Sequence, residues 1–327
     1  KSNLKTLESE MSKVTEAVYR WLDFDLRAPH DIPARVTASQ QLTFYGLRIV
    51  FGLIWLFNAW TASASANKHA IAQFMGLSFG SWPVRVIGNG VFLLDLIMAV
   101  ALLSGRGMRA ALWLGVVYLI VMWVGVSHTG GFNTAAGQTD PGIAPPYLIL
   151  FILTFACWRL SQAAPANNNA VAQEHARLWI HAMRLAFGFL WAWDALFKWH
   201  PYYLTHMVAY LTAAQDALPG WVATYDQMWI NVISFVGPVL VGVLAALLET
   251  VLAWSLITGK LMRWLLPIGG IYSLVIWSTA EGFGAPYTAL GQTGMTGNMF
   301  GNAAIYALIF FTFMAVYRWP KPITASV

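Results

Sequence analysis

Apolar residues occur along this chain in long blocks rather than in alternation with polar ones. Eight blocks come near the roughly 20 residues that a helix needs to cross a hydrocarbon core of about 30 Å. They lie near 42–62, 84–104, 109–127, 143–161, 178–198, 233–258, 262–280 and 299–317. In a bilayer the backbone must satisfy its own hydrogen bonds, and the blocks lack the alternating pattern of a closed barrel. The pattern predicts an all-α integral membrane protein with eight transmembrane helices.

The segment before residue 40 has a different pattern. Between Lys1 and Arg27, apolar residues recur at steps of three and four, while charged residues occupy the opposite face. This predicts an amphipathic helix that lies on the membrane surface or against a partner. Charge is spread throughout the segment and no apolar h-region follows, so we do not expect it to be a signal peptide.

The composition supports the membrane interpretation. Of the 327 residues, 58% are apolar and only 10% are charged, whereas an ordinary soluble domain has about 25% charged residues. A single cysteine, Cys157, excludes a disulfide scaffold and an intramolecular disulfide relay. The net charge of +5 is informative about topology rather than about nucleic acid, and we expect no nucleic-acid partner.

Basic residues between the blocks indicate the orientation of the chain. Most of them fall on one side of the predicted membrane, together with both termini. The connections on the other side hold only Lys68, Arg85 and Lys198. By the positive-inside rule, both termini are expected in the cytoplasm and the protein in the cytoplasmic (inner) membrane.

The two halves of the chain repeat each other. Asp95 and Glu249 lie 154 positions apart, and thirteen further matches share this offset, ending with Gly137-Gln138-Thr139 and Gly291-Gln292-Thr293. Arg48 and Arg184 begin a second set of matches at an offset of 136. The difference of 18 residues is a longer connection between blocks 5 and 6. Four helices per half give both copies the same orientation, so we expect two tandem four-helix bundles in a parallel repeat. The expected divisions are 1–40, 41–165 and 166–327.

The repeated motifs carry a family resemblance. Each half begins with Arg-x-x-Phe-Gly-x-x-Trp and has an acidic residue in its second block. A basic-x-Met-Arg turn follows that block, and Gly-Gln-Thr precedes the fourth block. Together these motifs resemble the DoxX/DoxD family, and the second half is more similar to DoxD through Glu281-Gly-Phe-Gly-Ala-Pro-Tyr and Gly301-Asn-Ala-Ala-Ile-Tyr306. The resemblance covers nearly everything after residue 40.

The resemblance implies a function and partners. DoxD is the membrane subunit of thiosulfate:quinone oxidoreductase, an enzyme of sulfur metabolism, so the resemblance implies electron transfer from thiosulfate to membrane quinone. The chain shows no evident soluble domain of the DoxA kind, which implies a separate DoxA-like or other redox subunit.

Four ionisable residues inside the apolar blocks are the candidate catalytic residues. An isolated charge at such depth costs at least a few kcal/mol, so we expect Arg48 to pair with Asp95 and Arg184 with Glu249 in the bundle interior. One interpretation is a structural ion pair that aligns helices. The other is a proton relay at a quinone pocket, because quinone reduction consumes two protons.

A second candidate cluster lies in the predicted outer connections. Gln138, Thr139, Gln292 and Thr293 follow glycines and offer donors suited to a small sulfur oxyanion such as thiosulfate. Lys198 and His200 add basic groups at the same rim. Glycine-rich turns that enter helices are also often only turns, and this alternative stays open.

Histidine spacing does not favour a metal or haem. His200 and His206 are six positions apart, which does not place both on one helical face, and His128 and His181 fall near opposite membrane sides. We therefore expect no metal or haem, and the resemblance implies quinone as the electron acceptor.

Two other function classes remain. The chain could be a non-catalytic DoxX-like membrane subunit that anchors or stabilises a redox or metalloenzyme complex. It could also be a transporter, but its charged residues lie near one side rather than at the midplane between inverted repeats.

Overall fold

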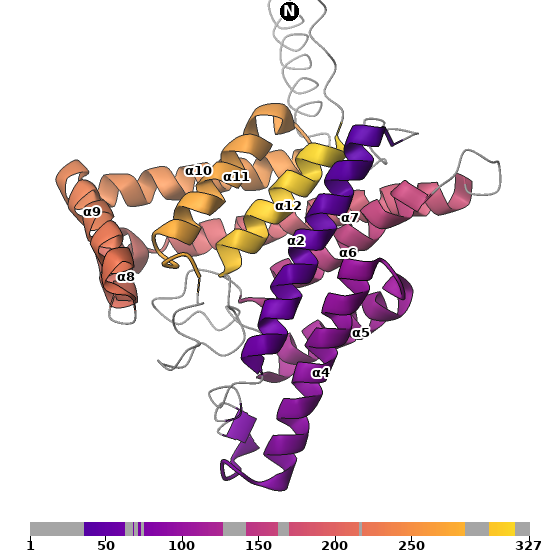
Figure 1. The fold of residues 1–327 in the computed structure, drawn as a ribbon. Coiled ribbons are helices and arrows are strands. Elements are labelled where there is room, and N and C mark those ends of the chain that lie inside the picture. The colour runs from indigo at the N-terminus through magenta and orange to yellow at the C-terminus, as the bar shows by residue number, and fades with distance from the viewer. Residues whose placement is uncertain are drawn as a thin grey trace, which may run out of the picture.

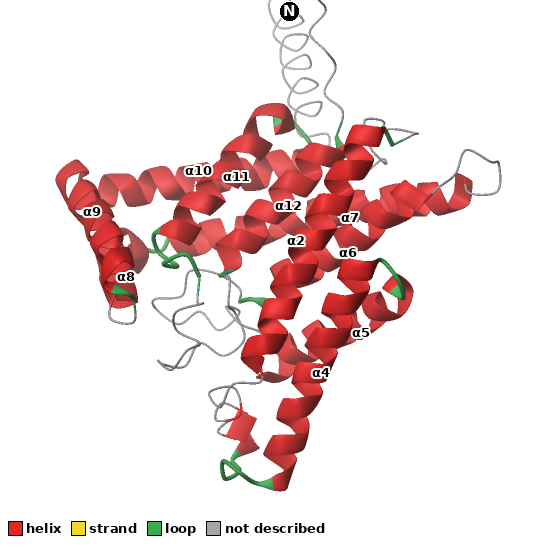
Figure 2. Ribbon diagram, in the orientation of Figure 1, coloured by secondary structure: helices red, strands yellow, loops and turns green. Residues whose placement is uncertain are grey.

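The described part of the protein is built from helices. The computed structural model describes residues 36–62, 68, 71–72, 75–126, 142–162, 170–215, 218–284 and 301–317, and it contains no strand in these ranges (Figure 2). The helices are α2 (Ala38–Ala62), α4 (Trp82–Ser104), α5 (Met108–Val121), the π-helical turn η1 (Met122–Val126), α6 (Ala144–Gln162), α7 (Ala170–Lys198), α8 (Pro201–Gln215), α9 (Gly220–Val236), α10 (Pro238–Thr258), α11 (Met262–Ser278) and α12 (Asn302–Val316). The all-α prediction is confirmed for this part, while the N-terminal amphipathic segment lies outside the described residues.

Local sequence sets the ends of α4 and α10 in the same way. Each helix has a proline in its first turn, where the missing N–H would have no helical partner. Each ends at a glycine with positive φ, Gly105 at 70° and Gly259 at 74°. The amide of each glycine donates to the carbonyl four residues earlier, which closes the last turn.

The predicted block 233–258 is divided between two helices. Gly237 has φ 108° and Pro238 follows it, so α9 ends at Val236 and α10 begins at Pro238. Proline cannot donate a backbone hydrogen bond and clashes with the preceding turn, which ends the first helix here. The longer connection after block 5 folds into two helices, α8 and α9.

Four helices are long and apolar enough to cross a membrane by length and composition. They are Ala38–Trp60, Trp82–Ser104, Ala144–Gln162 and Pro238–Thr258, and two shorter apolar helices are Met108–Val124 and Asn302–Val316. Large apolar side chains also lie exposed on the outside, including Leu42, Trp82, Trp113 and Leu196. Such an exterior suits lipid better than water, so the helices suggest a membrane protein.

The helices form two groups around a shared centre (Figure 1). In one group α2 packs along α4, and α5 along α6; in the other, α7 packs along α10 and α11 along α12. Helix α6 contacts both α7 and α12, so the groups share one buried apolar core. The α8–α9 hairpin contacts α10 and lies at the far left of Figure 1.

Candidate functional site

A buried acid and a tyrosine meet between α10 and α11. The hydroxyl of Tyr272 donates a hydrogen bond of 2.9 Å to Oε1 of Glu249, which is 1% exposed. Glu249 lies ten residues before Gly259, and Tyr272 lies ten residues after Met262. The two residues are therefore equally far from the turn that joins α10 to α11, about 15 Å along each helix axis. This brings them to the same level in the helix pair.

The first half holds an equivalent arrangement. Asp95 on α4 is 4% exposed and accepts a hydrogen bond from Tyr118 on α5. These residues lie ten positions before Gly105 and ten after Met108. Beside them, Nδ2 of Asn58 donates to the Tyr147 hydroxyl at 3.4 Å. Each half thus has a buried carboxyl that accepts a hydrogen bond from a tyrosine.

The predicted Arg48–Asp95 and Arg184–Glu249 ion pairs are not formed, and this expectation is corrected. Both arginines are buried, yet their guanidinium groups lie at the ends of the neighbouring helices, where a Cβ on Gly105 or Gly259 would overlap them. The carboxylates are ten residues further along those helices, about 15 Å away along the axis.

The buried charges of Arg48 and Arg184 are compensated by the C-terminal ends of helices instead of by carboxylates. The last carbonyls of an α-helix carry a partial negative charge, which favours a cation there. Arg184 also lies 3.3 Å from Nδ1 of His181 and 3.6 Å from the sulfur of Met262, and the Arg48 guanidinium stacks 4.9 Å from the ring centre of Tyr45.

Aromatic rings fill the space next to each acid–tyrosine pair. In the first half, Trp55 packs against Tyr118, Tyr147 and Phe151, with ring centres 5.8–6.1 Å apart. In the second half, Trp191 packs against Tyr272, Tyr306 and Phe310 at 5.2–6.1 Å. These rings make an apolar surround of low dielectric for the carboxyls, in which a hydrogen-bond donor such as tyrosine matters more than in water.

The predicted rim residues are only partly described. Gln138, Thr139, Gln292 and Thr293 lie outside the described residues. Lys198 ends α7, and its Nζ stands 4.8 Å from the ring centre of Tyr203. His200 is exposed, and its Nδ1 accepts a hydrogen bond of 3.2 Å from the amide of Tyr202. Lys198 and His200 therefore lie together at the start of α8.

Glu281 has a structural role at the start of α12. Its carboxylate oxygens accept hydrogen bonds of 3.0–3.2 Å from the amides of Asn302 and Ala303. An acid at this end also suits the positive end of the helix dipole. Gly301, with φ 78°, leaves room for the carboxylate, which a Cβ would overlap.

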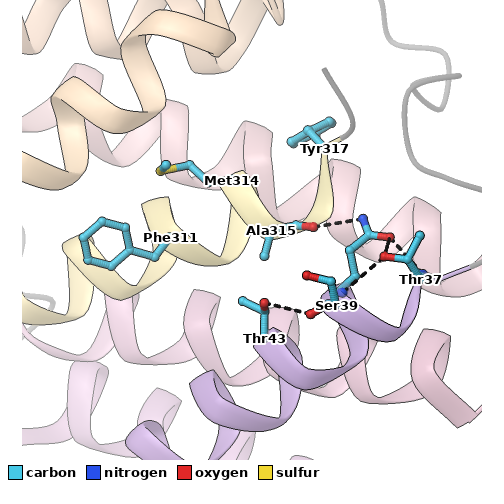
Figure 3. A pocket seen from close by; sticks show the side chains of 8 residues that line it. Thr37, Ser39, Thr43, Phe311, Met314, Ala315 and Tyr317 are labelled. Carbon is cyan, nitrogen blue, oxygen red and sulfur yellow. Dashed lines mark hydrogen bonds between the residues drawn. The ribbon is translucent and has the colours of Figure 1, made fainter. Parts of the chain in front are cut away.

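Other features of the described residues lie away from the acid–tyrosine pairs. No three His, Cys, Asp or Glu side chains in the described ranges are grouped as a metal ion would require. A groove between the start of α2 and the end of α12 is lined by Thr37, Thr43 and Phe311, among others (Figure 3). Nε2 of Gln40 donates there to the carbonyl of Ala315 at 3.0 Å, which ties the two halves together.

Tyr118 and Tyr272 are not among the site residues predicted from the sequence. The signal was present, because each tyrosine repeats at the offset of 154 and lies as far after the turn as its acid lies before it.

Comparison of the chain with protein-family models, with curated proteins and with solved structures returned no match.

Proposed function

We propose that the chain forms eight transmembrane helices arranged as two tandem four-helix bundles of the same orientation. Equivalent contacts support the duplication. Arg48 at Gly105 corresponds to Arg184 at Gly259, and Leu103 against Gly52 corresponds to Ile257 against Gly188. The excess of basic residues on one side supports cytoplasmic termini and a location in the cytoplasmic membrane.

We propose that this membrane protein is the membrane subunit of a quinone-linked oxidoreductase of the thiosulfate:quinone oxidoreductase kind. The observation that carries the proposal is the buried Glu249–Tyr272 pair, with Asp95 and Tyr118 at the equivalent positions. The resemblance to the DoxX/DoxD family supplies thiosulfate as the donor.

The chemistry of the pair suits a quinone substrate. Reduction of a quinone to a quinol takes up two electrons and two protons, and the quinone ring partitions into the apolar part of the membrane. In this proposal Glu249 holds a proton for the quinone oxygen, and Tyr272 orients the carboxyl through its hydrogen bond. A separate DoxA-like subunit delivers the electrons. The sulfur oxyanion binds at the outer ends of the helices, at Gln138, Thr139, Gln292, Thr293, Lys198 and His200.

Quinone reduction by the purified protein tests this function. The chain is isolated in mild detergent with its native partner subunits, and reduction of a soluble quinone analogue is followed by absorbance with and without thiosulfate. We expect reduction that depends on thiosulfate. If no quinone reduction occurs with the native partners and with thiosulfate or another small sulfur donor, the proposal is wrong.

A non-catalytic membrane subunit is the second candidate. The contacts of Arg48 with Gly105 and of Arg184 with Gly259 favour it, because there a buried charge packs against the end of a neighbouring helix. In that case Asp95 and Glu249 also serve packing, and replacing either one should lower the amount of folded protein and any activity of the complex by the same factor.

A further inference from the structure

The buried guanidinium of the first half has hydrogen-bond donors to spare. Arg48 on α2 is 7% exposed, and within the described part of the chain its side chain forms no ion pair and no hydrogen bond. Its contacts are the ring face of Tyr45 at 4.9 Å and the end of α4 at Gly105. A helix end carries only about half an elementary charge. Part of the charge and the N–H donors of Arg48 therefore remain available to another group.

The second half occupies the corresponding donors with its own side chains. Arg184 corresponds to Arg48, and His181 corresponds to Tyr45, each at the offset of 136. Nη2 of Arg184 lies 3.3 Å from Nδ1 of His181, and Nη1 donates to the sulfur of Met262 at 3.6 Å. Nε of Arg184 is fully covered, whereas the guanidinium nitrogens of Arg48 each keep some accessible surface. Of these two arginines, Arg48 is therefore the one that a ligand can reach.

The level of Arg48 is that of a lipid headgroup. The apolar helix α4, long enough to cross a membrane, ends at Ser104, and Arg48 contacts the next residue, Gly105. The guanidinium therefore lies where the apolar part of α4 ends. The excess of basic residues assigns this side to the cytoplasm.

A second cation adjoins Arg48. Arg106 follows Gly105 and is exposed. Adjacent Cα atoms are about 3.8 Å apart, so the Arg106 side chain starts within about 7 Å of the guanidinium that contacts Gly105. Between positions 36 and 139 the sequence has one acid, Asp95, which lies ten residues before Gly105. Two neighbouring arginines without an acid beside them in the sequence suit the oxygens of a phosphate group.

An exposed apolar face leads from Arg48 along α2. Tyr45, Leu53, Leu56 and Trp60 are all exposed, and their spacings of eight, three and four keep them on one face of the helix. Tyr45 lies at one end of this face, with its ring on the Arg48 guanidinium. A ligand with a phosphate and a long apolar chain matches both parts, whereas a free phosphate matches only the arginines.

We propose that Arg48 and Arg106 bind the phosphate of an anionic membrane phospholipid whose acyl chain lies along the exposed face of α2. The phosphate of phosphatidylglycerol keeps its negative charge, whereas the choline of phosphatidylcholine balances it within the headgroup, so the site favours phosphatidylglycerol. The inference goes beyond the proposed oxidoreductase function and does not depend on it.

Native mass spectrometry of the full chain in mild detergent tests the site by resolving protein with and without bound lipid. The protein is titrated with phosphatidylglycerol or with phosphatidylcholine of the same acyl chains, and the Kd of the first bound lipid is measured. We expect phosphatidylglycerol to bind more tightly. Arg106→Gln should weaken its binding by about fivefold, as expected for one cation at a membrane surface. Arg48→Gln should weaken it by about tenfold or more, because a buried charged donor is lost.

Lys260→Gln is the matched control for Arg106→Gln. Lys260 occupies the position of Arg106 in the second half, at the offset of 154. Its replacement removes the same charge from the equivalent turn and should leave the Kd of the first phosphatidylglycerol unchanged. An equal loss of affinity in Lys260→Gln and Arg106→Gln would mean a general attraction to basic turns and would overturn the inference.

Two further outcomes decide the proposal. Arg106 is exposed, so Arg106→Gln tests the site even if Arg48→Gln does not fold, and unchanged affinity in Arg106→Gln would overturn the inference. Inorganic phosphate at the same concentration as the lipid should not displace phosphatidylglycerol, because it makes no contact with the apolar face of α2. Displacement by inorganic phosphate would overturn the assignment of a lipid to this site.

Discussion

The guanidinium of Arg184 lies against Gly259, the left-handed residue that ends α10. Arg48 has the same relation to Gly105 at the end of α4. Each arginine thus compensates its buried charge with the negative end of a helix rather than with a carboxylate. The carboxylates, ten residues deeper along the same helices, are left to accept hydrogen bonds from tyrosines.

This relationship predicts that Gly259 does not tolerate a side chain. In Gly259→Ala the methyl group would collide with the Arg184 guanidinium, and the backbone would keep a left-handed conformation that costs about 1–2 kcal/mol for an L-residue. We expect a clear fall in the melting temperature of the purified protein in detergent.

Gly107→Ala is the matched control for Gly259. Gly107 has φ 67°, but a Cβ there meets nothing within 4 Å, so this variant carries the backbone cost alone. Gly259→Ala should therefore lower the melting temperature more than Gly107→Ala. Equal effects would mean that Arg184 does not occupy the space at the end of α10.

The packing of Phe310 on Gly269 gives a second prediction. A methyl group in Gly269→Ala would overlap the Phe310 ring in the core beside Trp191, and overpacking of this kind costs about 1–3 kcal/mol. Gly90→Ala, also in a helix but with open space around it, should be neutral or stabilise by up to about 1 kcal/mol. Thermal unfolding in detergent measures both, and a Gly269→Ala protein as stable as Gly90→Ala would contradict the packing described.

The hydrogen bond from Tyr272 to Glu249 gives a third prediction. Tyr272→Phe leaves a buried carboxyl oxygen without its donor, which costs about 1–3 kcal/mol. In Glu249→Leu the acceptor is absent, so adding Tyr272→Phe should cost less than it does in the wild type. A double-mutant cycle on the free energy of unfolding measures the difference. Additive effects would show that the two side chains do not interact.

Asp226 gives a pH-dependent prediction. This residue of α9 is fully buried, and neither carboxyl oxygen has a hydrogen-bond partner within the described part of the chain. Burial raises the pKa of Asp226 from 3.8 to about 6. Because the folded state holds this proton more tightly than the unfolded state, ionised Asp226 destabilises the fold, and its cost grows as the pH rises from about 4 to about 6.

Replacement of Asp226 by asparagine should remove that cost. We expect the melting temperature of Asp226→Asn, relative to the wild type, to increase between about pH 4 and pH 6 and to stay constant above. Thermal unfolding across this pH range measures it. A difference that does not change with pH would show that Asp226 does not titrate with a raised pKa.

The helix positions could be predicted from the sequence because apolar blocks of about 20 residues are a strong signal. Each predicted block coincides largely with a described helix, and the boundary error at 233–258 occurred at a visible local signal, Gly237-Pro238. The α8–α9 hairpin could not be predicted in the same way, because it is stabilised by contacts with α10 rather than by a block of its own.

The site could be predicted only in part. The rarity of charge in an apolar segment correctly indicated that Arg48, Asp95, Arg184 and Glu249 are buried. It did not indicate their partners, because a helix end and a tyrosine hydroxyl can both compensate a buried charge although neither is a charged residue. Which partner each buried residue meets depends on how the neighbouring helices align. The sequence shows this alignment only because each acid and its tyrosine are equally far from the turn that joins their helices.

The activity of a Glu249→Gln protein tests the central claim most directly. The variant keeps the size of the side chain and removes the proton that the account assigns to quinone reduction. With native partners and thiosulfate, we predict that quinone reduction per assembled protein falls by about a hundredfold or more, while the amount of assembled protein stays close to that of the wild type. Unchanged reduction, or a loss no greater than the loss of assembled protein, would contradict the account.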